Sequence, residues 1–144
     1  MNPTILKFGY PGSLIRDYAH WVVLLRPAQV TLGSLVLAAK SDAQAYSELP
    51  PEAFTEQAQV IGHIEQALRA FCAYEKINYL MLMMVDREVH FHVIPRYSEA
   101  RTFAGSAFPD HGWPGVPDLA RAVAPSVDLT ERIRKPLVTF FANL

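Results

Sequence analysis

The most informative segment of the chain reads Val85-Asp86-Arg87-Glu88-Val89-His90-Phe91-His92-Val93-Ile94-Pro95-Arg96-Tyr97. It is rich in β-branched and aromatic residues, and it places two histidines at positions i and i+2. Because side chains alternate across a strand, one face is expected to carry Glu88, His90, His92 and Ile94. The other face would carry Val89, Phe91 and Val93, which suit a core. The segment therefore predicts a strand with a paired imidazole surface opposite its apolar side.

The preceding sequence supplies further strands. Residues His20–Arg26 and Leu35–Ala39 are β-rich runs, and the connection between them, Pro27–Gly33, has turn residues at both ends, which predicts an antiparallel pair. Residues Ile77–Val85 are almost wholly apolar, which predicts a central strand covered on both faces. We expect Asp86 and Arg87 to turn the chain tightly into the histidine strand.

A long helix is predicted between these strand pairs, over residues 51–73. Pro50-Pro51-Glu52 suits a helix start, because proline fits the first turn and glutamate suits its positive end. A single apolar stripe follows at helical spacing, formed by Phe54, Ala58, Ile61, Ile64, Leu68 and Phe71. We expect this helix to lie across one face of the sheet. Residues 4–10 are predicted to be a short strand or an irregular lead-in.

The sequence changes character after Tyr97, where prolines and glycines become frequent. This part is predicted to wrap around the core and not to extend the sheet. A short helix over Leu119–Ala124 is expected to stop at Pro125. Another helix, capped by Asp128 or Thr130, is expected to be interrupted or restarted at Pro136.

Composition limits the class of protein. The 144 residues, 51% of them hydrophobic, predict one domain of 1–144, with a core of about 14–100 and an extension of about 101–144. A net charge of −1 without a basic stripe argues against a nucleic-acid polymer as partner. No apolar run approaches the ~20 residues of a membrane span, and no signal pattern opens the chain. The single cysteine, Cys72, is expected to be buried and suits a cytoplasmic location.

The run Val89-His90-Phe91-His92-Val93-Ile94-Pro95-Arg96 resembles the signature of the histidine triad (HIT) superfamily of nucleotide hydrolases and transferases. Residues Trp21–Pro27 and Leu32–Leu37 resemble the earlier strand pair of that family, and Asn78 fits the strand before the signature. The resemblance covers roughly residues 14–97. It implies an α+β fold: a mostly antiparallel, five-stranded sheet, a long helix on one face, and here an irregular C-terminal extension.

The resemblance also implies an activity and its residues. In the family the middle histidine attacks the α-phosphate of a nucleotide and forms a nucleotidyl-histidine intermediate. His90 matches that histidine and His92 the third one, so both are the predicted catalytic residues. Glu88, Arg96 and Asn78 are predicted substrate-binding residues of second rank. A homodimer paired across the sheet edge and helix, and a nucleotide-type substrate, are implied by the resemblance. No cofactor, no bound metal and no membrane partner are expected.

Three features depart from the family pattern. Glu88 stands where the first histidine belongs, only Asp86 and Arg87 separate the predicted strands where the family has a phosphate loop, and Ser41 or Asp42 replaces a further histidine. A carboxylate about 7 Å from His90 would interact with it by roughly 2 kcal/mol at an effective dielectric constant of about 20. Such a charge would favour protonated His90 and repel phosphate, which predicts a slow enzyme or an unusual substrate.

Three functions are therefore compared. The first is hydrolysis or transfer at the α-phosphate of a phosphoramidate, a dinucleoside polyphosphate or a nucleotide ester, for which a partly uncharged imidazole is a suitable nucleophile. The second is nucleotide binding with little or no turnover. The third is a metal site, since His-x-His on a strand near a carboxylate is a ligand pattern of zinc proteins.

Overall fold

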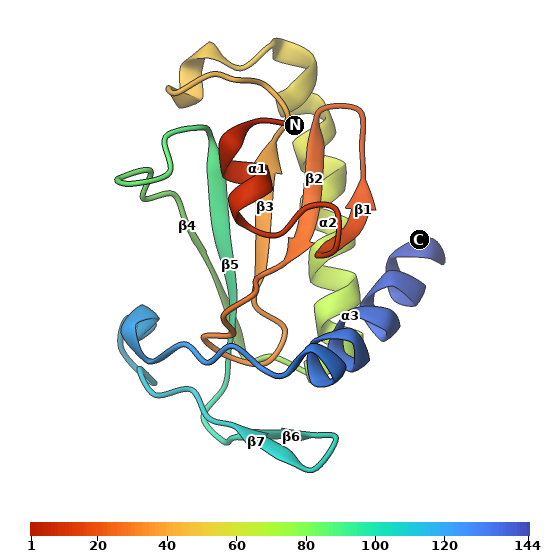
Figure 1. Cartoon of the computed structure of the whole chain (residues 1–144), viewed down its shortest axis with the longest axis vertical. Helices are drawn as coiled ribbons and strands as arrows, with labels where there is room; N and C mark the ends of the chain where they lie inside the picture. Colours follow the sequence, from red (N-terminus) through yellow and green to blue (C-terminus); the bar gives the residue numbers. More distant parts are fainter.

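The computed structural model describes all residues, 1–144, and contains a five-stranded antiparallel sheet (Figure 1). Its strands are β1 (Leu14–Asp17), β2 (Trp21–Leu25), β3 (Leu35–Ala39), β4 (Lys76–Leu80) and β5 (His90–Arg96). They are arranged in the order β1-β2-β3-β5-β4, and every neighbouring pair is antiparallel. The predicted fold class and the long helix on one face of the sheet are confirmed.

The remaining elements surround this sheet. They are α1 (Pro3–Lys7), the 3-10 turn η1 (Tyr46–Glu48), α2 (Pro51–Cys72), the hairpin β6 (Arg101–Phe103) and β7 (Ser106–Phe108), the 3-10 turn η2 (Leu119–Arg121), and α3 (Val127–Ala142). No helix is long and apolar enough to cross a membrane.

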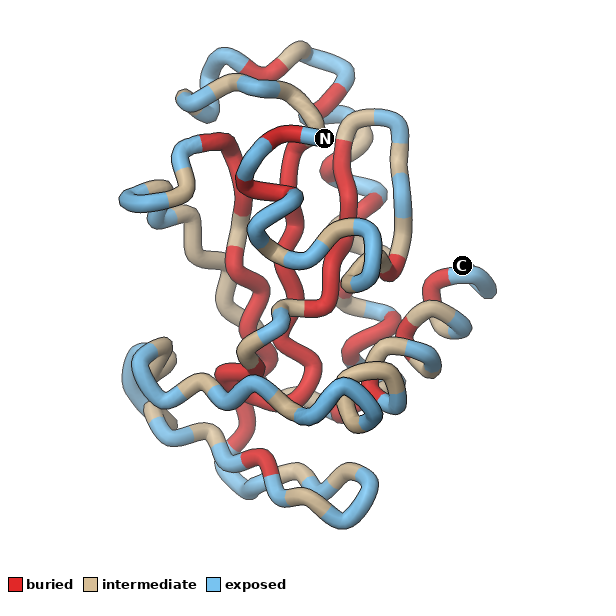
Figure 2. Tube along the Cα trace, viewed as in Figure 1, coloured by how far each residue is buried: buried red, intermediate tan, exposed pale blue.

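The main core lies between the sheet and α2. Strands β2 and β3 are buried along their whole length, because both are internal strands with packed faces (Figure 2). One face of α2 supplies Val60, Ile64 and Leu68, all fully buried. The indole Nε1 of Trp21 donates to the carbonyl oxygen of Ala53 at 2.8 Å, which fixes the start of α2 against β2. Cys72, at the end of α2, is buried as predicted, and burial raises the pKa of its thiol to about 12.

The opposite face of the sheet is covered by the N-terminal segment, which lies in front of β2 and β3 in Figure 1. Ile5 of α1 packs in a small cluster with Val22, Leu24, Val36 and Ala38. Asn2 caps α1 by accepting from the Ile5 N–H, and its amide group donates to the carbonyl oxygens of Ala39 and Ser41. The predicted short strand or irregular lead-in at residues 4–10 is therefore wrong at its start, where α1 forms.

The apolar run 77–85 does not form a central strand. Strand β4 ends at Leu80 and occupies an edge of the sheet, and residues 81–89 form a loop. Met84 and Val85 in this loop are 86% and 79% exposed. The predicted tight turn at Asp86-Arg87 is also wrong. Apolar composition alone could not distinguish a buried strand from an apolar loop that lines a cavity.

The C-terminal region wraps around the core, as predicted, and is mostly exposed or half-buried (Figure 2). Only the 3-10 turn η2 forms in place of the helix predicted over Leu119–Ala124. Helix α3 is capped by Ser126, whose hydroxyl accepts from the Leu129 N–H at 3.1 Å, and not by Asp128 or Thr130.

Helix α3 also continues through Pro136 without interruption. Ile133, Leu137 and Phe141 lie on its buried side, before and after the proline, and all three are fully buried. Their burial offsets the roughly 3 kcal/mol that a proline costs inside a helix. The side chain of Arg134 donates to the Leu14 carbonyl, which attaches α3 to β1.

Candidate active site

Strand β5 presents His90 and His92 on the face of the sheet away from α2. The centroids of the two imidazole rings are 5.3 Å apart. The ring of Phe8 contacts both, with its centroid 5.7 Å from that of His90 and 5.6 Å from that of His92. Phe91, between them in sequence, packs on the other side against Trp21 and Tyr46. The predicted alternation of faces is confirmed, and the third aromatic ring beside the histidines comes from the segment that follows α1.

The ring of His90 is held by the backbone of its own strand. Its Nδ1 lies 2.7 Å from the carbonyl oxygen of Glu88. A carbonyl can only accept, so Nδ1 carries the proton, and in the neutral ring the lone pair is on Nε2. His90 is 1% exposed, and no buried side-chain nitrogen of the chain lacks a partner. The Nε2 atom, which has no protein partner, therefore reaches the solvent-accessible space in front of the strand.

The ring of His92 is held from a different strand. The Nε–H of Arg26, the residue after β2, donates to Nδ1 of His92 at 3.3 Å. A guanidinium can only donate, so in neutral His92 the proton is on Nε2. Burial, followed by the charge of Arg26, lowers the pKa of His92 to about 4. His92 is thus a neutral N–H donor beside the Nε2 lone pair of His90.

This pKa predicts a pH dependence of stability. Between pH 6.5 and 4 the unfolded chain binds a proton at His92 that the folded chain does not, so the free energy of unfolding falls as pH falls through this window. We expect His92 to account for about 2 kcal/mol of that loss. Urea unfolding of wild type and His92→Gln at pH 7 and pH 4 measures it. His63, whose pKa is also lowered, is present in both proteins and cancels. Equal losses in the two proteins would contradict the assignment.

A cavity of about 410 Å³, named here the histidine cavity, opens in front of the two rings. Its walls are Lys7, Phe8, Arg26, Leu82, Met83, Met84, Val85, Asp86, His90, His92 and Leu119. The loop 81–89 supplies one apolar wall, which explains why these apolar residues are not in the core. Met83 has a positive φ of 50°, which is unusual for a side chain of this size. Lys7 pairs with Asp86 at 2.7 Å and ties α1 to this loop.

Glu88 does not face the histidine cavity. Its Oε1 accepts from the hydroxyl of Thr4 at 2.7 Å, and the side chain lines an adjoining cavity that also includes Lys7 and Arg87. Thr4 is 2% and Glu88 9% exposed. The residue in the place of the first histidine is therefore bonded to α1, while its backbone carbonyl holds His90.

The Thr4–Glu88 bond is expected to stabilise this arrangement. Replacing Thr4 by valine keeps the shape but leaves the buried carboxylate without its hydroxyl donor, which costs about 1–3 kcal/mol. Thr4→Ser retains the hydroxyl and is the matched control. Chemical unfolding of the two variants measures the difference. Equal free energies of unfolding for the Thr4→Val and Thr4→Ser variants would show that the hydrogen bond does not contribute to stability.

Asn78 and Arg96 are brought together, but away from the histidine cavity. Arg96 is 3% exposed and forms a buried ion pair with Asp110, with Nε 2.7 Å from Oδ2. Its other donors reach Oδ1 of Asn78 at 2.7 Å and the Gly115 carbonyl at 2.9 Å. Both residues line a different cavity, beside Trp113. Arg96 therefore connects the sheet to residues 110–115 through its ion pair and hydrogen bonds. Arg96 and Asn78 were predicted as substrate-binding residues of second rank, and the structure places both outside the histidine cavity.

The two histidines are also without further metal ligands. No group of three His, Cys, Asp or Glu side chains in the structure is arranged to hold a metal ion. The one carboxylate that lines the histidine cavity, that of Asp86, pairs with Lys7. The site is organised around hydrogen-bonded imidazoles and two cations, Lys7 and Arg26.

Comparison with solved structures places this arrangement among known folds. A protein from Sulfolobus tokodaii described as a hypothetical histidine triad nucleotide-binding protein matches 98% of this chain and 91% of its own, at 17% identity and a TM-score of 0.71. A histidine triad protein from Sinorhizobium meliloti matches 94% and 95% of the two chains, at 20% identity and a TM-score of 0.69. The chain has the histidine triad (HIT) fold. A zinc-bound HIT family protein from Mycobacterium smegmatis also matches, over 97% and 94% of the chains, at 17% identity and a TM-score of 0.60.

The sequence itself matches no family model and no curated protein. The HIT assignment therefore depends on the fold and on the short histidine segment. These are independent observations, because the fold is set by the apolar pattern of the whole chain and the segment by local chemistry.

Sequence reasoning missed Arg26, Phe8, Lys7 and Thr4 as parts of the site. Arg26 was visible only as the last residue of a β-rich run. Its approach to His92 depends on β2, β3 and β5 being neighbours in that order. Phe8, Lys7 and Thr4 reach the site because α1 crosses the sheet. The one sequence signal for Arg26 is its place directly after β2, where a cation ends an apolar run.

Proposed function

We propose that the chain is a nucleotide hydrolase or nucleotidyl transferase that acts at the α-phosphate of a nucleotide conjugate through a nucleotidyl-His90 intermediate. Candidate conjugates are a nucleoside phosphoramidate, a dinucleoside polyphosphate and a nucleotide ester. The observation that carries the proposal is the 2.7 Å hydrogen bond from Nδ1 of His90 to the Glu88 carbonyl. It leaves the Nε2 lone pair available toward the cavity, which is what a nucleophile needs.

The proposed reaction has two displacements. In the first, Nε2 of His90 forms a bond to the α-phosphorus, and the bond from phosphorus to the leaving group breaks with its electron pair going to that group. The imidazole becomes cationic, and the Glu88 carbonyl stabilises its remaining N–H. In the second, water adds to phosphorus, loses a proton to solvent, and breaks the phosphorus–nitrogen bond. His90 is then restored and a nucleoside monophosphate is released.

His92 and the cations are proposed to bind the phosphate during these steps. Neutral His92 directs Nε2–H toward the space beside His90, because Arg26 occupies its Nδ1. A donor in a fixed orientation stabilises the charge that develops on the phosphate oxygens. Arg26 adds positive charge to the cavity wall, whereas Lys7 is paired there with Asp86. The apolar wall formed by Phe8 and the loop 81–89 suits a flat, apolar part of the conjugate.

A nucleotide-binding protein with little turnover is the second candidate. The observation that favours it is the loop 81–89, which has no glycine and places the carboxylate of Asp86 on the cavity wall. Backbone N–H groups of a glycine-rich loop would otherwise approach the phosphate closely. A metal site is less favoured, since no third ligand accompanies His90 and His92.

The assay separates these candidates. Purified chain is incubated with adenosine 5′-phosphoramidate, diadenosine triphosphate and an adenylate ester, and adenosine monophosphate is measured together with the intact protein mass. The proposal expects release of adenosine monophosphate and a transient gain of one adenylate per chain. Tight binding without either product would favour the second candidate.

We also propose that the chain forms a homodimer. Strand β4 is at the edge of the sheet, with β5 as its only neighbour, so its outer edge has backbone groups available for another strand. A second copy paired along β4 would also bring the loop 81–89 near the contact. Sedimentation equilibrium measures the mass in solution, and a monomer at all concentrations would exclude the dimer.

A further inference from the structure

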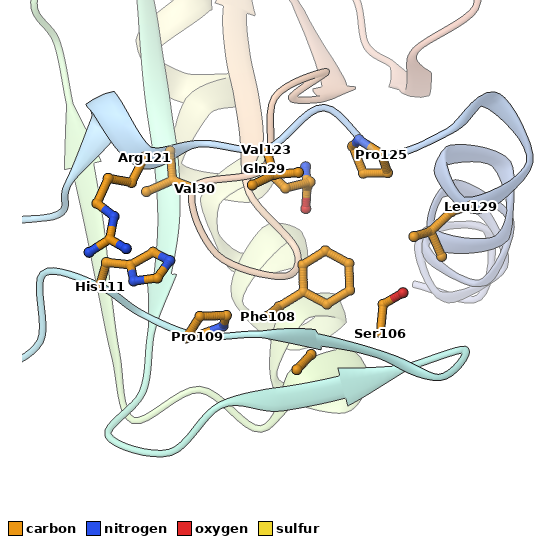
Figure 3. Close-up of a pocket in the computed structure, with 11 residues that line it drawn as sticks. Gln29, Val30, Ser106, Phe108, Pro109, His111, Arg121, Val123, Pro125 and Leu129 are labelled. Atoms are coloured by element: carbon orange, nitrogen blue, oxygen red, sulfur yellow. The ribbon is translucent and has the colours of Figure 1, made fainter.

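A second cavity, of about 380 Å³, lies beside Gln29 and Val30 in the turn that follows β2. It is enclosed by the turn after β2, the hairpin β6–β7, and the segment that leads from η2 into α3 (Figure 3). We name it the extension cavity, because most of its wall comes from residues 106–129. It shares no residue with the histidine cavity. The proposed nucleotide reaction makes no use of it.

The wall of the extension cavity is held firmly by Gln29. The backbone of Gln29 forms a two-way bridge with Val123, with N–O distances of 2.8 and 3.0 Å. Its side-chain amide donates to the carbonyls of Arg26 and Ser34, and its Oε1 accepts from the Gly33 and Ser34 N–H groups. Gln29 is 2% exposed. Its polar atoms are all engaged, so it shapes the cavity and offers nothing to a ligand.

The middle of the cavity is apolar. Figure 3 shows the ring of Phe108 in the centre, with Val30 and Val123 above it and Leu129 of α3 on the right. Phe108 and Val30 are nearly buried, while Val123 is 59% exposed although it lines a concave surface. Small-molecule sites are usually concave and lined mainly by apolar side chains, as this cavity is.

One end of the cavity is cationic. His111 and Arg121 both lie at the left end in Figure 3, away from Leu129. The guanidinium of Arg121 takes part in none of the ion pairs of the chain and in no side-chain hydrogen bond. Asp110, next to His111 in sequence, is fully engaged by Arg96, with Nε 2.7 Å from Oδ2. The cationic end therefore has no carboxylate partner within the chain.

We propose that the extension cavity binds a small amphipathic anion: an aromatic or short aliphatic body that carries one sulfonate, phosphate or carboxylate group. The apolar body packs on Phe108, Val30 and Val123. The anionic group pairs with Arg121 and lies beside His111. The length of the cavity separates the two ends, which selects molecules whose charge is terminal.

Two probes with the same body test the proposal. 2-Naphthalenesulfonate is the anion, and 2-naphthalenesulfonamide is its uncharged match. Each is titrated into the full chain labelled at the methyl groups of valine and leucine. We expect 2-naphthalenesulfonate to shift the resonances of Val30, Val123 and Leu129 while those of Leu82 and Val85, in the histidine cavity, stay in place. Arg121→Gln should weaken its binding about fivefold, the upper end for one exposed charge pair, and leave the sulfonamide unaffected.

Arg132→Gln is the matched control, because Arg132 is an exposed arginine on α3 that lines no cavity. It should bind both probes as wild type does. The proposal is overturned if the sulfonate shifts only the histidine-cavity methyl groups or none, if the sulfonamide binds as tightly as the sulfonate, or if Arg121→Gln and Arg132→Gln have the same effect. Because Arg121 is exposed, its replacement does not disturb the core, and the amide spectrum of each variant verifies this.

Discussion

Replacing His90 by asparagine is expected to lower the release of nucleoside monophosphate by at least about a thousandfold. Asparagine is polar and of similar size, so it can still donate to the Glu88 carbonyl, but it has no nitrogen lone pair that can attack phosphorus. The adenylate adduct should disappear from the mass spectrum at the same time. Binding of adenosine monophosphate should change far less, since the phosphate donors remain. The measurements are turnover, intact mass and a binding isotherm on the same preparations.

His20→Asn is the control for that variant. His20 precedes β2, outside the histidine cavity, and its ring forms no hydrogen bond within the chain, so the activity should be unchanged. If the His90 variant retained turnover and the adduct, the nucleophile would be a different group and the proposed reaction would be wrong. If wild type and His90→Asn were both inactive but bound the nucleotide equally, the binding protein would be the correct alternative.

Replacing Arg26 by glutamine is expected to have the second largest effect, a loss of about a hundredfold in kcat/KM. The variant removes the Nε–H donor that sets the ring of His92, so the proton of His92 is no longer confined to Nε2. It also removes a nearby positive charge. Because that charge helps to lower the pKa of His92, the pKa should rise from about 4 toward its ordinary value. The acidic limb of the kcat/KM profile should move to higher pH in the variant.

That movement of the pH profile distinguishes a positioning role from general loss of structure. Arg132→Gln, on the exposed side of α3, should leave the rate and the profile unchanged. A drop in kcat/KM without any movement of the acidic limb would indicate that Arg26 stabilises the local fold and does not control the protonation state of His92. Thermal unfolding of both variants measures the structural contribution separately.

Much of the fold could be predicted because its signals are local. The helical period of α2 and the β-rich runs of β2 and β3 identify these elements. The predicted stripe of α2 is only partly the buried face, because Ile64 and Leu68 are buried while Phe54 and Ala58 are exposed. Residues 82–85 depart from the rule that apolar residues are buried, since they are apolar yet line the histidine cavity. Pro136 broke another, because the buried residues on both sides of it, Ile133 and Leu137, keep α3 intact.

The residues of the candidate site also fall into those that local sequence identifies and those that only the tertiary fold brings together. The local pattern of β5 identifies His90 and His92, and even the atom that holds His90 is only two residues away, at the Glu88 carbonyl. Glu88 was expected to act on the site through its charge. It is instead bonded to Thr4, 84 residues away in sequence. No local pattern contains a contact of that separation.

The sequence by itself determined the strand, the alternation of its faces and the pair of imidazoles, because these depend on neighbours along the chain. The tertiary structure alone decided the chemistry of the pair. The order of the strands brings Arg26 to His92, and α1 brings Phe8 and Thr4 to β5 and its approach. The physical reason is that the tautomer and pKa of an imidazole depend on what touches its nitrogens and excludes its water, and for His92 those groups come from distant segments.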